Sequence, residues 1–359
     1  MDVILDANVY VSDFRMEGVL FQSLFDYLKK TDSSLVIPRI VFDEVTARYT
    51  EMLSQGIEKA KKHLSLLRRL LLAAEIPQID HIDLTRELNA LRQKLNPNKE
   101  MLTRFDPAKQ VTLLDDYSGV TIQEVARRGF ERMPPASRGG EQLRDVIVWL
   151  SSVSYCRSSQ SSVAFISGDK TFTGTGATTL QPRLQEELVR ENVSLHFYRG
   201  IDDFLKAESL KPIPVTESWV EQSLSSAEIS RRFEEEGHNS VIIPWHGDRT
   251  GLVLGSKVHF QNGSVYEIGA ESQYCELEYS GLVSVRVIDK PYPPPEEIMP
   301  PEEARLERMR NPGQVEEYDL PALMRLSIRL VEGKMKNIET ESYQVPSWPK
   351  PKLSFRLSQ

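Results

Sequence analysis

Short apolar runs that lead into an acidic residue are the feature that most constrains the fold of this chain. Val3–Leu5 runs directly into Asp6, and the run Val163–Ser167 is followed at once by Gly-Asp, ending at Asp169. Leu35–Ile37 is a third apolar run of similar length. Runs this short, separated by segments with helical spacing, predict buried strands of a parallel sheet. We therefore expect an α/β fold, in the form of a three-layer α/β/α domain with a central parallel sheet.

Segments with helical periodicity connect these strands. We expect helices over about Met16–Lys30, Ile40–Leu72, Glu141–Ser154 and Leu180–Arg190, and a further strand over Val193–Tyr198. The mostly polar segment between residues 77 and 135 is interpreted as a helical insertion over the sheet.

The composition changes near residue 210, which indicates a second domain. Lys211–Pro214 has the proline content of a linker, and a helix is expected over Ser218–Glu236. Short apolar segments between glycine-rich turns then predict a small, mainly antiparallel β domain; they lie at 240–244, 251–260, 264–268, 274–279 and 282–289. Another helix is expected over Leu320–Lys334, before a proline-rich tail. We assign residues 1–209 to the α/β domain and residues 210–359 to the linker, helix, β domain and tail.

Four acidic residues occupy positions that a parallel sheet would bring to one edge. Ligands bind such sheets beyond the carboxyl ends of the strands, where Asp6 and Asp169 are expected. Asp145, near the start of a helix, and Glu44, early in another helix, can point to the same edge. Asp43 is adjacent to Glu44, so the phase of the helix decides which of the two faces the sheet.

Carboxylates held this close repel one another. Two like charges 4 Å apart cost about 4 kcal/mol at an effective dielectric constant of ~20. A divalent cation relieves that repulsion, and oxygen ligands without a matching His or Cys favour Mg²⁺ or Mn²⁺ over zinc. An ion held in this way activates a water molecule and stabilises the charge on a phosphate. The sequence therefore predicts a metal-dependent enzyme.

The bulk composition indicates a globular protein of a reducing compartment. The net charge is −8, and the two cysteines are too few for a disulfide scaffold. The sequence has no run of 18 apolar residues and no signal-peptide pattern. We expect a cytoplasmic protein that does not span a membrane.

An acidic protein can still bind nucleic acid through a local basic patch. The candidate contacts are basic residues near the two later acids: Arg127, Arg128, Arg138, Arg144 and Lys170. The alternative interpretation is that these residues form a solvated helix face.

The order of these motifs resembles the PIN-domain nucleases, including a bacterial group with an inserted helical region and a C-terminal β domain. The resemblance covers roughly residues 1–205 and rests on Asp6, Asn8, Glu44, Asp145 and the Ser-Gly-Asp of residues 167–169. It implies a metal-dependent phosphodiesterase that cleaves single-stranded RNA, or in some members DNA. The acidic metal ligands of the family carry over onto Asp6, Glu44, Asp145 and Asp169, and its auxiliary polar positions onto Asn8 and Ser167. The bacterial relatives imply a toxin or phage-defence role.

Two other interpretations remain open. A haloacid-dehalogenase-like phosphatase also begins with a strand ending in Asp, but it needs a second Asp where this chain has Asn8. A non-catalytic PIN module could bind RNA or dock a partner protein. The C-terminal domain could bind the substrate, a partner protein or a second copy of the chain, and the spacing of its residues does not choose between these.

Overall fold

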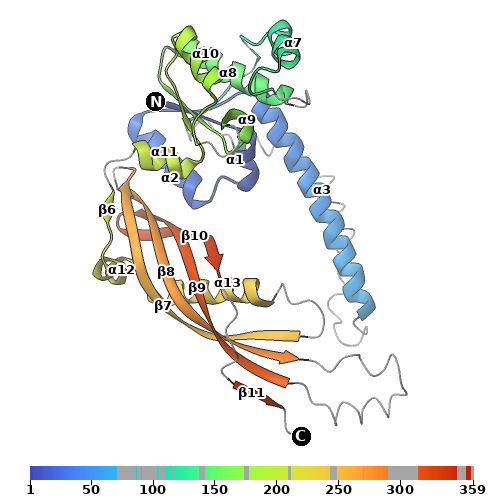
Figure 1. Cartoon of the computed structure of the whole chain (residues 1–359), viewed down its shortest axis with the longest axis vertical. Coiled ribbons are helices and arrows are strands. Elements are labelled where there is room, and N and C mark those ends of the chain that lie inside the picture. The colour runs from blue at the N-terminus through green and yellow to red at the C-terminus, as the bar shows by residue number, and fades with distance from the viewer. Residues whose placement is uncertain are drawn as a thin grey trace. The chain divides into compact units, whose positions relative to one another are not determined.

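The fold comes from a computed structural model and falls into two units. Met1–Glu208 forms the first and Ser209–Gln359 the second, each with its own sheet (Figure 1). The structure describes residues 1–70, 86, 90, 103–104, 110–114, 116–117, 119–136, 142–173, 178–208, 212–242, 249–269, 271–289, 314–345 and 353–356. Within these ranges, no helix combines the length and the apolar composition that crossing a membrane requires.

The N-terminal unit is built on a five-stranded parallel sheet in the order β3-β2-β1-β4-β5. Its strands are β1 Asp2–Leu5, β2 Leu35–Ile37, β3 Val111–Leu113, β4 Val163–Ile166 and β5 Leu195–Tyr198. The apolar residues of β1 and β4 are fully buried because helices cover both faces of the sheet. This arrangement confirms the predicted α/β fold with a central parallel sheet, and it puts β1 and β4 side by side at the centre.

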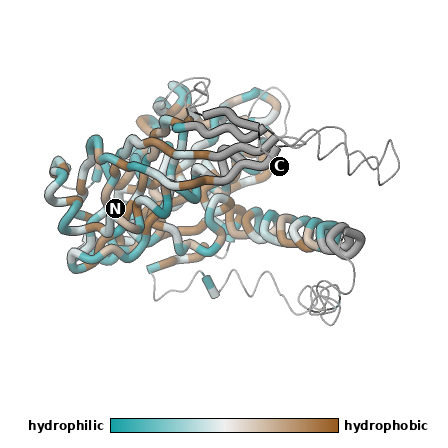
Figure 2. Tube along the Cα trace, turned by 90° about the horizontal axis from the view of Figure 1, so that it is seen from below, coloured by the Kyte–Doolittle hydropathy of each residue, from teal (hydrophilic) through white to brown (hydrophobic). Residues whose placement is uncertain are grey.

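Helices pack on both faces of this sheet. They are α1 Ala7–Ser12, α2 Val19–Thr31, α3 Arg39–Leu70, α7 Ile122–Glu131, α8 Leu143–Ser159, α9 Lys170–Thr173, α10 Pro182–Glu191 and α11 Ile201–Glu208. Figure 1 shows α8 and α10 on one side of the strands and α2 and α11 on the other. α3 is a single uninterrupted helix through Gly56. Hydrophobic and hydrophilic residues alternate along the part of α3 that Figure 2 colours.

The segment between residues 77 and 135 contains more than helix. Val111–Leu113 forms β3, which pairs with β2 through Leu35↔Val111 and Ile37↔Leu113. A strand of three residues at the sheet edge is too short to show a recognisable alternation of apolar and polar residues within a polar segment. The interpretation of the whole segment as a helical insertion is therefore wrong at β3, while most of residues 71–109 lie outside the described residues.

The C-terminal unit contains a six-stranded antiparallel sheet in the order β10-β9-β8-β7-β6, with β11 also paired to β9. The strands are β6 Ile213–Pro214, β7 Arg249–Glu267, β8 Ser272–Asp289, β9 Gln314–Val331, β10 Lys334–Gln344 and β11 Leu353–Arg356. Helices α12 Glu217–Ser223 and α13 Ser226–Ile242 precede β7, and Phe233 of α13 is buried with Val283 and Leu326 of the sheet. The mainly β character predicted for this region is confirmed.

Two details of the C-terminal prediction are wrong. The expected helix Leu320–Lys334 belongs to β9 and β10, and alternate residues from Leu320 to Leu330 are buried with the period of a strand. Leu, Ala and Met favour helices intrinsically, but pairing with β8 and β10 overrides that preference here. The expected strand at 240–244 is, as far as Ile242, the end of α13.

The strands are also much longer than expected, because glycines taken as turns lie inside them. A Cβ on Gly281 would lie 2.4 Å from the carbonyl oxygen of Lys257 and 2.8 Å from the Phe233 ring. A Cβ on Gly263 would lie 2.5 Å from Leu277. These glycines therefore allow close packing in the middle of a strand rather than a reversal of the chain.

Candidate functional site

Asp6 lies at the carboxyl end of the central strand β1 and is buried. It caps the N-terminus of α1, where its Oδ1 accepts a hydrogen bond from the Ala7 backbone N–H at 2.7 Å. Its Oδ2 accepts a hydrogen bond from the Ser167 hydroxyl, also at 2.7 Å. Because β1 and β4 are neighbours, the residue after β4 reaches the carboxylate that follows β1. Both oxygens of Asp6 are thus fixed in position.

Asp169 lies in the turn between β4 and α9. Its backbone N–H donates to the Ser167 hydroxyl at 3.1 Å, and its Oδ1 accepts from the Thr171 backbone N–H at 2.8 Å. Ser167 is fully buried and therefore links Asp6 to the Asp169 turn.

Glu44, in the second turn of α3, turns its carboxylate inward. Its side chain is only 8 % exposed, and its Oε1 accepts from Arg48 at 2.9 Å and from Arg144 at 3.0 Å. The neighbouring Asp43 is 41 % exposed and pairs with Arg39 instead. The helix phase therefore selects Glu44 over Asp43, the choice that the sequence left open.

Asp145 lies in the first turn of α8 and is half-buried. Its pKa is raised to about 6, first by burial and then by the charges of Asp6, Asp169 and Glu44, against the hydrogen bond from the Thr171 hydroxyl, which lowers it. The pKa of Asp6 is also raised to about 6, first by burial and then by Glu44 and Asp169, against the hydrogen bonds from Ser167 and Ala7. The structure thus brings all four predicted acids within electrostatic reach of one another.

The donor set of this acidic cluster (Asp6, Glu44, Asp145 and Asp169) fits a hard divalent cation in its chemistry. All its ligating atoms are carboxylate oxygens, which suit Mg²⁺ or Mn²⁺. In the described ranges, the ion pairs made by these four carboxylates are those of Glu44 with Arg48 and Arg144. Among the described residues, no basic side chain forms an ion pair with the three aspartates. No three His, Cys, Asp or Glu side chains of the described residues lie close enough together to form a ready metal-binding group.

The polar and basic positions predicted around the site differ in their surroundings. Asn8 is exposed on α1, and its Nδ2 lies 4.0 Å from the point where a Cβ on Gly168 would be. Arg144 is exposed beside Glu44, and Lys170 is exposed at the start of α9. Arg138 lies outside the described residues.

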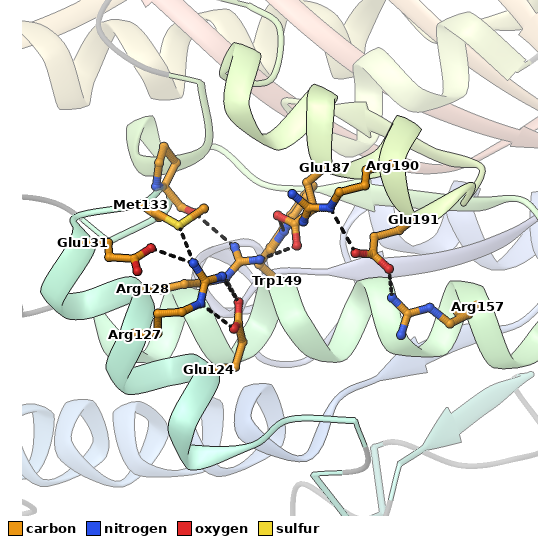
Figure 3. Close-up of polar contacts among 11 residues, drawn as sticks. Glu124, Arg127, Arg128, Glu131, Met133, Trp149, Arg157, Glu187, Arg190 and Glu191 are labelled. Carbon is orange, nitrogen blue, oxygen red and sulfur yellow. Dashed lines mark hydrogen bonds and ion pairs between the residues drawn. The ribbon is translucent and has the colours of Figure 1, made fainter.

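Arg128 does not face solvent, and we leave it out of any nucleic-acid surface. Its side chain is 1 % exposed, and its guanidinium donates to Glu187, to Glu124 at 3.0 Å and to the Pro134 carbonyl at 3.2 Å (Figure 3). A basic residue in a polar helix gives no sequence signal of such burial. Arg127 is partly exposed, and its guanidinium pairs with Glu124 and Glu131.

The Arg128–Glu187 pair joins three helices behind the site. Glu187 of α10 also accepts a hydrogen bond from the Trp149 indole N–H of α8 at 3.0 Å (Figure 3). Arg128 of α7 is thereby tied through one carboxylate to the helix that carries Asp145. This network contacts α8 through the buried Trp149, one helical turn after Asp145.

Thr171 is a residue of the site that the sequence analysis missed. Its hydroxyl is buried without a hydrogen bond of ordinary length and lies near enough to Asp145 to lower that pKa. The sequence signal that could have identified Thr171 is its position two residues after Asp169, in the helical turn that follows. The Thr171 hydroxyl is therefore a further polar group of the site, beside Asp145.

Residues 3–172 match the family model of the PIN domain. The matched range contains the whole acidic cluster, and it confirms the resemblance inferred from the order of the motifs. PIN domains are generally nucleases, so the match supports an enzyme that cleaves nucleic acid. Comparison with the curated proteins and with the solved structures gave no match.

We expect Arg128→Ala to destabilise the N-terminal unit by about 3 kcal/mol, because it leaves the Glu187 carboxylate buried without a partner. Arg127→Ala is the matched control on the same helix and should have only a small effect, since its ion pairs are solvent-exposed. The urea dependence of hydrogen exchange at the α8 amides measures the loss of stability caused by each substitution. Equal effects of the two substitutions would contradict the role given to Arg128.

We also expect Asp145→Asn to raise the melting temperature of the metal-free protein at pH 7.5 by about 2 °C. The Asp145 pKa lies near 6 in the folded protein and at 3.8 ordinarily, so ionisation opposes folding above pH 6. This penalty fades as the pH falls from 6 towards 4, and the gain from the substitution should shrink by pH 4.5. Asp43→Asn, which removes a paired carboxylate, should give no such gain. A melting temperature of Asp145→Asn below that of the wild type at pH 7.5 would contradict the repulsion between Asp145 and the other acids.

Proposed function

We propose that this PIN domain is a metal-dependent endonuclease and that its substrate is RNA, single-stranded or structured. The observation that carries the proposal is the electrostatic interaction among four carboxylates, which come from the end of β1, from α3, from α8 and from the turn after β4. Burial and mutual repulsion raise the pKa of two of them, Asp6 and Asp145. Repulsion within such a cluster lowers the stability of the fold. Carboxyl groups with pKa values raised in this way concentrate at active sites.

In this proposal Asp6, Glu44, Asp145 and Asp169 would hold Mg²⁺ or Mn²⁺. When bound, the ion supplies an activated water and stabilises the charge that develops on the scissile phosphate. Ser167 keeps Asp6 oriented by donating to its Oδ2. Asn8 and Lys170 are exposed near the Asp169 turn, where an amide and an ammonium group can donate to phosphate oxygens.

Glu44 has two functions in this account. Its ion pairs with Arg48 and Arg144 hold both guanidinium groups at the rim of the acidic cluster. Arg144 remains exposed and can also contact a phosphate. Glu44 therefore couples the acidic cluster to a positive edge that would attract the substrate backbone.

One feature beside Asp6 favours a nuclease over a phosphatase that forms a covalent aspartyl phosphate. The position of the general acid of such a phosphatase is the amide Asn8, which is exposed. A non-catalytic module, in turn, gains nothing from the repulsion between the acids.

The biological setting proposed is a cytoplasmic bacterial toxin or phage-defence nuclease. This part rests on the relatives of the PIN-domain family that the sequence resembles. The C-terminal unit would then hold the substrate, a partner protein or a second copy of the chain.

The proposal predicts metal-dependent cleavage of single-stranded RNA or tRNA, with less cleavage of single-stranded or duplex DNA. Asp6→Asn and Asp145→Asn should each reduce the cleavage rate at least about 100-fold, because each removes a ligand charge. Asp43→Asn is the matched control and should retain most activity. The assay compares Mg²⁺, Mn²⁺ and a chelator on end-labelled substrates.

Three outcomes would contradict the proposal. Unchanged cleavage by Asp145→Asn would remove that residue from the site. Cleavage that persists in the chelator would exclude the metal. A phosphorylated wild-type chain, with no cleavage of any nucleic acid, would favour the phosphatase.

A further inference from the structure

A cavity lies in the C-terminal unit, between the helices α12 and α13 and the strands β7 and β8. Its volume is about 160 Å³. The residues that line it come from α12, from the connection to α13, from the first turn of α13 and from the two strands. The cavity therefore belongs to a different unit from the acidic cluster.

The walls of the cavity are mainly apolar. On the helix side, it is lined by the buried side chains of Val220, Leu224 and Ile229. On the sheet side, Val258 and Phe260 of β7 line it. A cavity of about 150 Å³ with walls of this kind holds a benzene ring, so this one has room for one ring or one branched alkyl group.

The connection between the two helices contributes to this space. Leu224, at the C-cap of α12, has an extended backbone with φ −126° and ψ 145°. Because of this conformation α13 is not a continuation of α12, and it begins as a separate helix at Ser226.

Two features of this region lower the stability of the fold. Tyr279 of β8 lines the cavity opposite Phe260, with the two ring centroids 5.8 Å apart. Its hydroxyl is buried and has no hydrogen-bond partner among the described residues, which costs free energy. The unfilled volume beside it forfeits packing contacts as well. Local departures from full packing and full hydrogen bonding are expected at functional sites.

Two carboxylates lie at the solvent-exposed side of the cavity. Glu217 and Glu221 both line it, both are exposed, and their spacing of four residues puts them on the same face of α12. Among the described residues, no basic side chain pairs with either of them; Arg231 of α13 pairs with Glu228 and Glu235 instead. An apolar cavity thus opens beside two negative charges that no described cation neutralises.

We propose that this cavity binds a small organic amine, with its apolar ring or branched alkyl group inside and its ammonium group held by Glu217 and Glu221. The apolar walls supply the affinity for the body of the ligand, and the two carboxylates select a positive end group over a neutral or negative one. This proposal does not depend on the nuclease function, because it uses no residue of the N-terminal unit.

The test uses the full chain and three probes that share a phenyl ring and differ in the charge of their end group. They are phenethylamine (an ammonium), phenylethanol (a hydroxyl) and phenylpropionate (a carboxylate), and ligand-observed NMR titration gives each Kd. We expect phenethylamine to bind with a Kd of about 1 mM or tighter. Phenylethanol should bind about fivefold more weakly, and phenylpropionate more weakly still.

Substitutions then separate the charge from the cavity. The double variant Glu217→Gln/Glu221→Gln should weaken phenethylamine binding about fivefold and leave phenylethanol binding unchanged. Val220→Phe fills part of the cavity and should abolish the binding of both probes. Glu235→Gln is the matched control, because it removes an exposed carboxylate of α13 outside the cavity, and it should leave each Kd unchanged. Circular dichroism confirms that each variant is folded.

Three results would overturn the proposal. The first is no binding of phenethylamine at concentrations up to about 10 mM. The second is binding of phenylpropionate as tight as that of phenethylamine. The third is unchanged phenethylamine binding in both the double glutamine variant and Val220→Phe. Cleavage of nucleic acid by the wild type tests the nuclease separately and decides none of these results.

Discussion

Electrostatic repulsion among four carboxylates at one edge of the parallel sheet is the constraint on which the rest of the N-terminal unit depends. Three of the four carboxylates are held there by specific local contacts. Asp6 is fixed by the Ala7 N–H and the Ser167 hydroxyl, and Glu44 by two guanidinium groups. Asp169 is fixed by the N–H of Thr171. These contacts keep the carboxylates converged although burial and mutual charge raise the pKa of Asp6 and Asp145.

The fold supplies the rigidity that such a site requires. β1 is the middle strand of five, so Asp6 projects from the most enclosed part of the sheet. The Arg128–Glu187–Trp149 network ties α7, α8 and α10 together one helical turn after Asp145. Removing the partner of a buried charge is strongly destabilising, so this network limits how far α8 can move away from the cluster. The fold thus holds the carboxylates in place although their charges repel one another. A bound cation would relieve the repulsion and leave the carboxylates in the same positions.

The sequence predicted the site better than its surroundings because the rule for parallel strands is local. An acid that directly follows a buried strand must lie at the carboxyl edge, so Asp6 and Asp169 could be placed from a few residues each. Glu44 could not be separated from Asp43, because one residue of helix phase decides between them. The burial of Arg128 depends on Glu187, 59 residues away, and no local pattern reveals such a pair.

The errors in the C-terminal unit also have a physical reason. Residues from Leu320 onward are intrinsically good helix formers, and only pairing with distant strands makes them β9. The alternation of buried residues from Leu320 to Leu330 was the signal that favoured a strand. Gly281 resembled a turn residue, but it is glycine because Phe233 of α13 packs against it.

The most direct test of the central claim is the number of protons released when Mn²⁺ binds. Calorimetric titration at pH 6 in two buffers of different ionisation enthalpy gives that number. The account predicts binding with net proton release at pH 6, because Asp6 and Asp145 are partly protonated there and must ionise to hold the ion. Release should be much smaller at pH 7.5. Absence of Mn²⁺ binding, or binding without proton release at pH 6, would contradict the claim that these carboxylates repel one another and are relieved by a cation.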